Sequence, residues 1–120
     1  MSDDEKLVDL RIPESNLATV LLLVVVGTLD EIRAGRWHPG AGIWAFSRPV
    51  FLAELREREQ LSAEALAVLG HCDELDAIEE RLPGKLGSKI DQMLEVLRAE
   101  LYRQRNLDYR IELPDPTDRA

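Results

Sequence analysis

The sequence has 120 residues, with 23 acidic and 15 basic side chains, and its net charge is −8. This length fits one domain, residues 1–120, and the apolar share of 45% is typical of a globular protein. The acidic balance argues against nucleic-acid binding, which needs a basic face for phosphate contacts, and favours a basic partner. We expect flexible tails at 1–6 and 115–120.

Three features predict a cytoplasmic protein. Cys72 is the only cysteine, so no internal disulfide forms, which suits a reducing compartment. The first ten residues are acidic where a secretory signal is basic. The apolar run over 17–29 is shorter than the ~20 residues of a bilayer-spanning helix, so we expect a buried core helix and no membrane contact.

Short segments near the two chain ends have the alternating pattern of half-buried strands. Val8, Leu10 and Ile12 alternate with polar residues, and a similar alternation runs over 107–113. The two segments either pair as a two-stranded ribbon or lie separately as extended arms. A free ribbon edge would offer a docking place for a partner strand.

A long apolar helix is predicted over about 17–34. Ser15 or Asn16 is expected to cap its first turn, and Gly35 to end it in a left-handed conformation. Residues 20–26 contain only Val and Leu, so we expect this helix to be covered on all sides at the centre of the protein.

Three further helices are expected after a loop over 36–42. Ser47 followed by Pro49 indicates a helix start, which predicts a second helix over 48–59. Ser62 is expected to cap a third helix, 63–81, and the Pro-Gly pair that follows to break it. The apolar positions of this third helix are Leu66, Leu69, Cys72, Leu75, Ile78 and Leu82. The fourth helix, about 85–104, has an apolar stripe formed by Leu86, Ile90, Met93 or Leu94, Leu97 and Leu101.

The predicted fold is therefore mainly α: a compact bundle of about four helices around a buried apolar first helix. Whether the two chain ends add a small two-stranded β ribbon to this bundle is left open.

One group of metal-capable residues lies at His71, Cys72 and Asp76. On a helix, Cys72 and Asp76 share a face whereas His71 points about 100° away, so the three do not converge. No CxxC, HExxH or phosphate-binding glycine loop accompanies them. Core packing of Cys72 is the favoured interpretation, and we predict no cofactor, no metal site and no catalytic residue.

An acidic set follows on the third predicted helix. It consists of Asp73, Glu74, Asp76, Glu79 and Glu80. A solvated helix face is the ordinary interpretation of such a run. The functional interpretation is a docking patch for a basic partner, and the net charge favours it.

Two tryptophans, Trp37 and Trp44, lie at the loop over 36–42. They either anchor an interface, where Trp is a common hot-spot residue, or plug the end of the bundle. We favour the plug, but both residues remain candidates for partner binding. His38, beside Trp37, has no partner that the sequence identifies.

Three segments of the middle of the chain resemble a family of small, helical bacterial proteins, some of which occur beside toxin genes. They are 46–49 (Phe-Ser-Arg-Pro), 70–78 (Gly-His-Cys-Asp-Glu-Leu-Asp-Ala-Ile) and 82–86 (Leu-Pro-Gly-Lys-Leu). The family pattern has a Phe-Ser-Pro-like helix start, an acidic helix and a Leu-Pro-x-Lys-Leu turn. Arg48 and the loop over 35–42 depart from it. The resemblance implies a small α-helical immunity protein that binds and neutralises a cognate toxin, with no established active site.

The leading hypothesis is a cytoplasmic, non-enzymatic binding protein whose acidic helix face docks a basic toxin domain. The alternative is a self-associating or adaptor protein, such as a homodimer, that uses its ribbon edge or its tryptophan loop. A metal-dependent enzyme using His71, Cys72 and Asp76 is the least favoured hypothesis.

Overall fold

The computed structural model describes residues 6–40, 43–104 and 110–114, and among them it is mainly α-helical. The α-helices are α1 (Leu17–Arg33), α2 (Pro49–Arg58), α3 (Ala63–Gly70), α4 (Leu75–Arg81) and α5 (Pro83–Arg103). Short 3₁₀ helices lie at η1 (Glu14–Asn16), η2 (Ile43–Ser47) and η3 (Cys72–Glu74). The predicted mainly α fold is confirmed.

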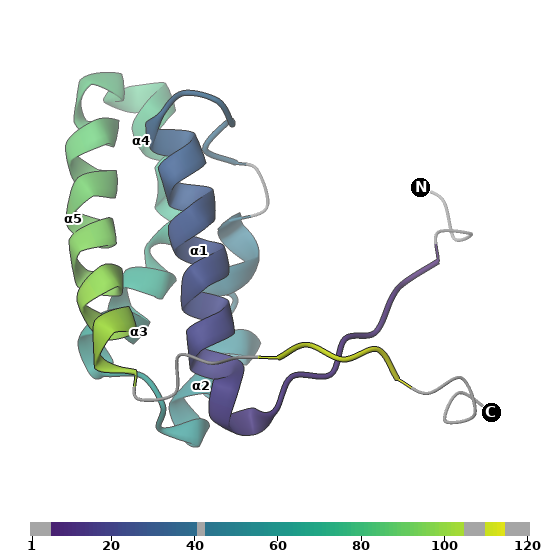
Figure 1. Ribbon diagram of the computed structural model, residues 1–120. Coiled ribbons are helices and arrows are strands. Elements are labelled where there is room, and N and C mark those ends of the chain that lie inside the picture. Colours follow the sequence, from purple (N-terminus) through teal and green to yellow (C-terminus); the bar gives the residue numbers. More distant parts are fainter. Residues whose placement is uncertain (1–5, 41–42, 105–109, 115–120) are drawn as a thin grey trace.

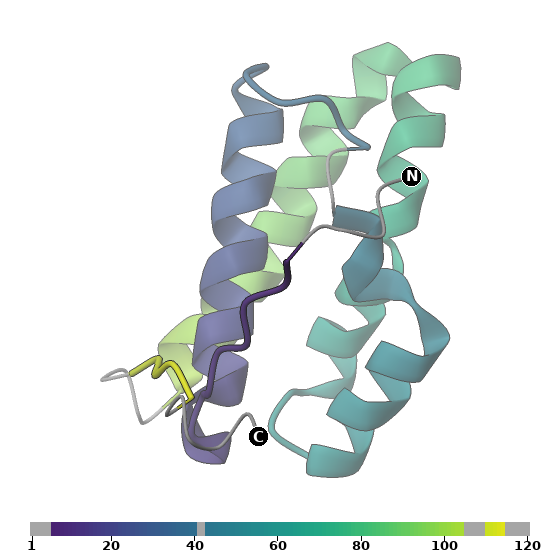
Figure 2. The ribbon, with the colours of Figure 1, turned by 90° about the vertical axis from the view of Figure 1, so that its right-hand side faces the viewer.

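The two long helices, α1 and α5, lie side by side and run in opposite directions (Figures 1 and 2). Two ion pairs join them along their exposed edges. Arg33 Nε lies 2.9 Å from Asp91 Oδ1, and Arg98 Nη2 lies 2.7 Å from Asp30 Oδ1. The remaining helices cover the other side of this pair and complete one hydrophobic core. Its fully buried residues include Val25, Leu29, Leu75, Ile90 and Leu97.

Helix α1 contributes much of the core, but it is not covered on all sides. Leu23 is 38% exposed and Val24 is 48% exposed, whereas their neighbours Leu22 and Val25 are buried. The prediction of an all-round buried helix is therefore wrong for one face. A helix that has neighbouring helices on one side only buries the stripe that faces them, whatever the composition of its opposite face.

Together with η1, helix α1 is long and apolar enough to match the length and composition of a membrane-spanning helix. The run is Glu14–Arg33, and 44% of its most apolar window is buried inside the protein. The core helix of a globular protein meets the same criteria, so length and composition do not distinguish the two.

The third predicted helix is divided. It becomes α3, η3 and α4, and the α-helix is interrupted from His71 to Glu74. Leu69, Cys72 and Leu75 are buried as predicted, but Leu82 is 55% exposed because the chain turns there into α5. Helix α5 begins at Pro83, which occupies the first turn, where its missing N–H is not needed.

Side chains from distant positions hold the end of the bundle where α1 begins. Gln60 Oε1 accepts a hydrogen bond from the Ala18 amide, and Gln60 Nε2 donates one to the Glu14 carbonyl. Gln60 therefore satisfies a free amide of the first turn of α1. Asn16, which was expected to do so, stands at the N-cap position without a side-chain capping bond.

Glu100 is the buried charge of this same end. Its side chain is 3% exposed; it accepts a 2.6 Å hydrogen bond from the Ser62 amide and pairs with Arg103. Burial by itself would raise the pKa of Glu100, but the hydrogen bonds from Arg103 and Ser62 outweigh it and hold that pKa below its usual value. As predicted, the Ser62 side chain caps α3 by accepting from the Ala65 amide.

The described parts of the two chain ends meet away from the helices. Arg11 and Glu112 form an isolated antiparallel bridge, in which each amide donates to the other's carbonyl at 2.6 and 2.8 Å. No strand forms among the described residues, so the predicted ribbon is reduced there to this one bridge. The rest of its second segment, 107–109, and the tails 1–5 and 115–120 lie outside the described residues.

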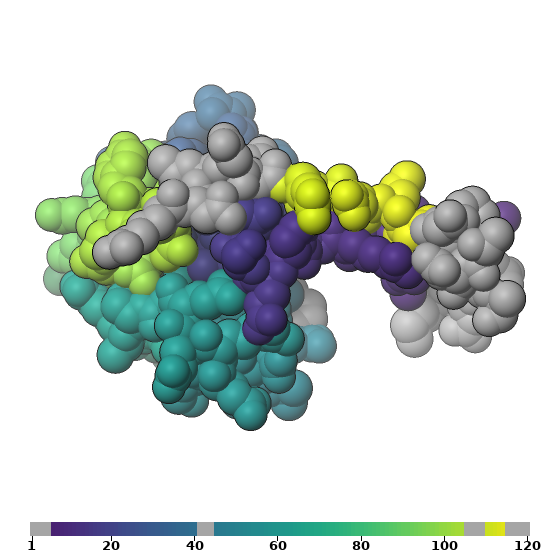
Figure 3. Space-filling model, turned by 60° about the horizontal axis from the view of Figure 1, so that its bottom comes forward, coloured from purple at the N-terminus to yellow at the C-terminus, as the bar shows by residue number. Residues whose placement is uncertain are grey.

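Figure 3 shows the described parts of these ends, 6–13 and 110–114, projecting together from the helical body. Several of their apolar side chains are exposed: Leu7 by 88%, Val8 by 70% and Leu113 by 63%. We call these segments the terminal arms; none of their described residues belongs to the hydrophobic core cluster.

Candidate functional site

The acidic set is divided between η3 and α4. Asp73 and Glu74 lie on η3, and Asp76, Glu79 and Glu80 lie on α4. Four of the five residues are exposed, and Glu79 is half-buried. Residues three or four positions apart share a helix face, so Asp76 has both glutamates of α4 as neighbours.

The ion pairs of these carboxylates differ from those on α1 and α5. Among the described residues, none of the five forms an ion pair with Arg or Lys; their only ion-pair partners are the two histidines. Four acidic residues of α1 and α5, by contrast, each contact an arginine: Asp30, Glu31, Asp91 and Glu100. The arginine bonds at Asp91 and Glu31 lower the pKa of each carboxyl. The five acidic residues of η3 and α4 therefore form a negative patch with no Arg or Lys ion pair among the described residues, although Arg81 ends the same helix; we call these five residues the acidic patch.

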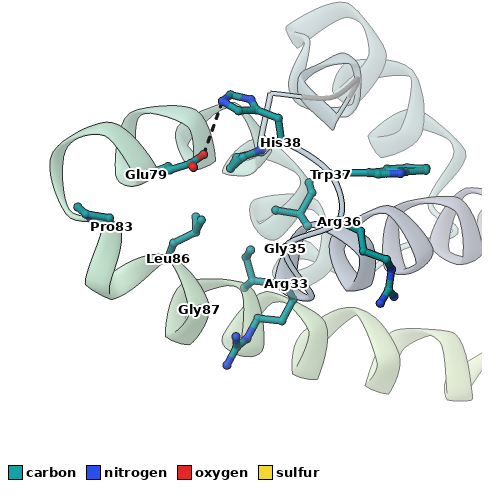
Figure 4. A pocket seen from close by; sticks show the side chains of 12 residues that line it. Arg33, Gly35, Arg36, Trp37, His38, Glu79, Pro83, Leu86 and Gly87 are labelled. Atoms are coloured by element: carbon teal, nitrogen blue, oxygen red, sulfur yellow. Dashed lines mark ion pairs between the residues drawn. The ribbon is translucent and has the colours of Figure 1, made fainter.

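His38 lies against this patch, although the sequence alone identified no partner for its side chain. It belongs to the loop after α1, and its Nε2 atom lies 3.7 Å from Glu79 Oε2 and 3.9 Å from Asp76 Oδ1. Its Nδ1 atom accepts a 3.0 Å hydrogen bond from the Gly40 amide. Figure 4 shows the imidazole turned towards Glu79 across the gap between loop and helix.

Gly40 lies at the point where the loop meets α4. A Cβ atom there would lie 3.3 Å from His38 Nδ1 and 3.6 Å from Asp76 Oδ2. On the helix side, Glu79 Oε2 is buried and has no hydrogen-bond partner among the described residues. The structure thus brings one imidazole and two carboxylates together, and leaves one carboxylate oxygen without a donor.

A cleft of about 440 Å³ opens beside this cluster, between the end of α1, the loop and the start of α5. Trp37, Glu79, Pro83 and Leu86 are among its lining residues. Trp37 is 51% exposed, and its ring points away from the pair of His38 and Glu79 (Figure 4). Trp37 therefore does not plug the bundle. Trp44 lies in η2, but its side chain is outside the described residues.

The other metal-capable group does not assemble. Cys72 is 1% exposed and belongs to the core, which confirms its predicted packing role. Burial, with a further contribution from the charge of Asp73, raises the pKa of the Cys72 thiol to about 12. His71 instead faces Glu74, with Nδ1 and Oε1 3.0 Å apart. A protonated, buried thiol is a poor nucleophile and a poor ligand.

Comparison with known proteins gives no relative. The chain matches no protein-family model, no curated protein and no solved structure. The resemblance to toxin-associated bacterial proteins therefore stays a hypothesis, and the candidate site rests on the geometry alone.

The sequence analysis named the acidic residues and Trp37 as candidates, but it did not predict that His38 contacts Asp76 and Glu79. The signal that was present is the spacing of Asp76 and Glu79, which places two carboxylates on one helix face. The contact with His38 spans 38 positions or more of the chain and depends on how the loop folds back, which no local pattern encodes.

Proposed function

We propose that this chain is a non-enzymatic binding protein that docks a basic protein partner on the acidic patch, and that the partner is the toxic domain of a bacterial toxin. The observation that carries the proposal is that five carboxylates over eight positions have no Arg or Lys partner among the described residues. Like charges three or four positions apart on a helix repel each other. A basic partner would relieve this repulsion and would be attracted by the same field.

The position of Trp37 supports the same surface. An exposed tryptophan beside a charged area is the kind of residue that dominates binding energy once a partner covers it. Trp37 lines the cleft that Glu79 also lines, so one partner can contact both. The likeness to toxin-associated proteins and the single cysteine favour a cytoplasmic immunity protein, whose task needs a stable complementary surface and no chemistry of its own.

The experiment begins with capture of the partner from the native host at low salt. The purified partner is then tested twice: for growth inhibition when expressed alone and rescue by this chain, and for affinity as a function of salt. We expect rescue, and an association rate that falls as salt rises.

A matched pair of variants locates the surface. Asp76→Lys with Glu80→Lys changes the acidic patch, whereas Glu57→Lys with Glu95→Lys makes the same change of net charge at exposed positions elsewhere. We expect the first pair to weaken binding about tenfold or more and the second to have a small effect, since steering depends on where the charge lies. Equal effects of the two pairs would reject the site.

The terminal arms favour a second candidate function, self-association. Leu7, Val8 and Leu10 on one arm and Ile111 and Leu113 on the other are exposed apolar side chains on extended chain, which suits pairing with a second copy. Light scattering separates the two candidates: a dimer that persists at high salt and is lost in Leu10→Ser supports self-association, and a monomer at all salt concentrations excludes it.

A further inference from the structure

The cluster of His38, Asp76 and Glu79 combines ligand types and distances that suit a metal ion. We propose that these three residues bind one divalent transition-metal ion, with Zn²⁺ as the ion that the donor set fits best. This site shares Asp76 with the group predicted at His71, Cys72 and Asp76 but uses neither His71 nor Cys72, and it does not depend on the proposed partner.

The three donors already lie near one point. One ligand atom from each residue lies within 4.8 Å of the others, and His38 Nε2 is 3.7 and 3.9 Å from the two carboxylate oxygens. Zinc binds nitrogen and oxygen at about 2.0–2.2 Å, so tetrahedral ligands stand about 3.3 Å apart. Small side-chain rotations, with the backbone in place, therefore bring these atoms to coordination distance.

The unpaired oxygen of Glu79, on a side chain that is 40% exposed, is a further feature that a bound cation would satisfy. Glu79 Oε2 is buried and has no hydrogen-bond donor among the described residues, yet it is one of the atoms closest to His38 Nε2. A buried carboxylate oxygen without a donor is unfavourable because it has lost its water. A bound cation would replace that lost solvation directly.

Charge and donor type select the class of ion. Two carboxylates and a neutral imidazole carry a total charge that balances a divalent cation. The mixture of nitrogen and oxygen favours Zn²⁺ and its transition-metal neighbours over Mg²⁺ and Ca²⁺, which prefer oxygen alone. The group is half open to solvent, so water or Glu80, which lines the same surface pocket, would complete the coordination.

The hydrogen bond at the other imidazole nitrogen gives the proposal a distinctive consequence. Because Nδ1 of His38 accepts from the Gly40 amide, a neutral imidazole carries its proton on Nε2, facing the carboxylates. Metal binding through Nε2 moves the proton to Nδ1, with no net proton release from a neutral imidazole. The Gly40 amide must then lose this acceptor.

The direct test is calorimetric titration of the full chain with ZnCl₂, after removal of metal with a chelator. We expect one Zn²⁺ per chain, a rise in melting temperature with added Zn²⁺, and no comparable response to Mg²⁺. His38→Gln and Glu79→Gln should each weaken binding by on the order of 100-fold, since even outer-shell partners of a metal are worth about 10–100-fold.

The matched control is His71→Gln. It removes the other histidine, which also faces a glutamate, and should leave Zn²⁺ affinity unchanged. Nitrogen NMR shifts of His38 should identify Nε2 as the ligand, and the Gly40 amide should exchange faster with the metal bound. Absence of stoichiometric binding, or equal weakening by His71→Gln and His38→Gln, would overturn the proposal. Failure to bind a toxin would leave it untouched, because no partner enters this titration.

Discussion

The carboxylates at the two ends of the helical bundle differ in their bonding partners. Around Ser62, the buried carboxylate of Glu100 is held by a backbone amide and by Arg103. Around α4, four exposed carboxylates and the half-buried Glu79 have no Arg or Lys ion pair in the described part of the chain. The comparison teaches that Glu100 serves the fold, whereas the acidic patch adds repulsion to the fold and is better explained by something outside it.

The largest expected effect is at the folding end. Glu100→Ala removes the acceptor of the buried Ser62 amide and leaves Arg103 without its partner, so we expect a loss of about 1–3 kcal/mol in the free energy of unfolding. Urea denaturation measures it. Glu95→Ala, at an exposed position of the same helix, is the control and should change stability little. Similar losses for both variants would contradict the assignment of Glu100 to the fold.

A smaller effect is expected in the acid limb of the stability curve. The pKa of Glu100 is lower in the folded chain than its ordinary value of 4.5, so its contribution is complete above that pH. It is lost as the pH falls through the lower folded pKa. Denaturation at several pH values below 5 should therefore show a shallower decline for Glu100→Gln than for the natural sequence. If stability fell equally steeply with pH in both proteins, the bonds of Glu100 would not stabilise its ionised form in the folded chain.

The smallest effect is expected at the acidic patch, and it has the opposite sign. Glu80→Lys replaces a like-charge neighbour of Asp76 by an acid-to-base pair four positions apart, so stability should rise by about 0.5 kcal/mol. Thermal unfolding at low salt measures this gain, and high salt should reduce it. A loss of stability would show that the patch contributes to the fold after all, and the contrast between the two ends would fail.

Local sequence patterns predicted the elements that depend on neighbouring residues. Gly35 has the expected left-handed backbone with φ of 78°, Ser62 caps α3, and Cys72 lies in the core. Each of these follows from residues within a few positions, where backbone geometry and helix periodicity decide the outcome.

Features that depend on distant contacts were not predictable in the same way. The interruption at His71 could not be read from the apolar periodicity, because Leu69, Cys72 and Leu75 are buried on both sides of it. The capping of α1 by Gln60 spans 42 positions. At the site, the acidic residues could be identified from the sequence, but the folding of His38 onto them could not, because it depends on the path of a glycine-containing loop.

The reactivity of the buried Cys72 thiol can be used to measure how often the core opens. With the pKa raised to about 12 and 1% exposure, this thiol is protonated and shielded at neutral pH. A chromogenic disulfide reagent should therefore label it only in molecules that have opened the core between α3 and α4. Because Cys72 is the single cysteine, the labelling rate follows that opening at one defined atom, without any engineered probe.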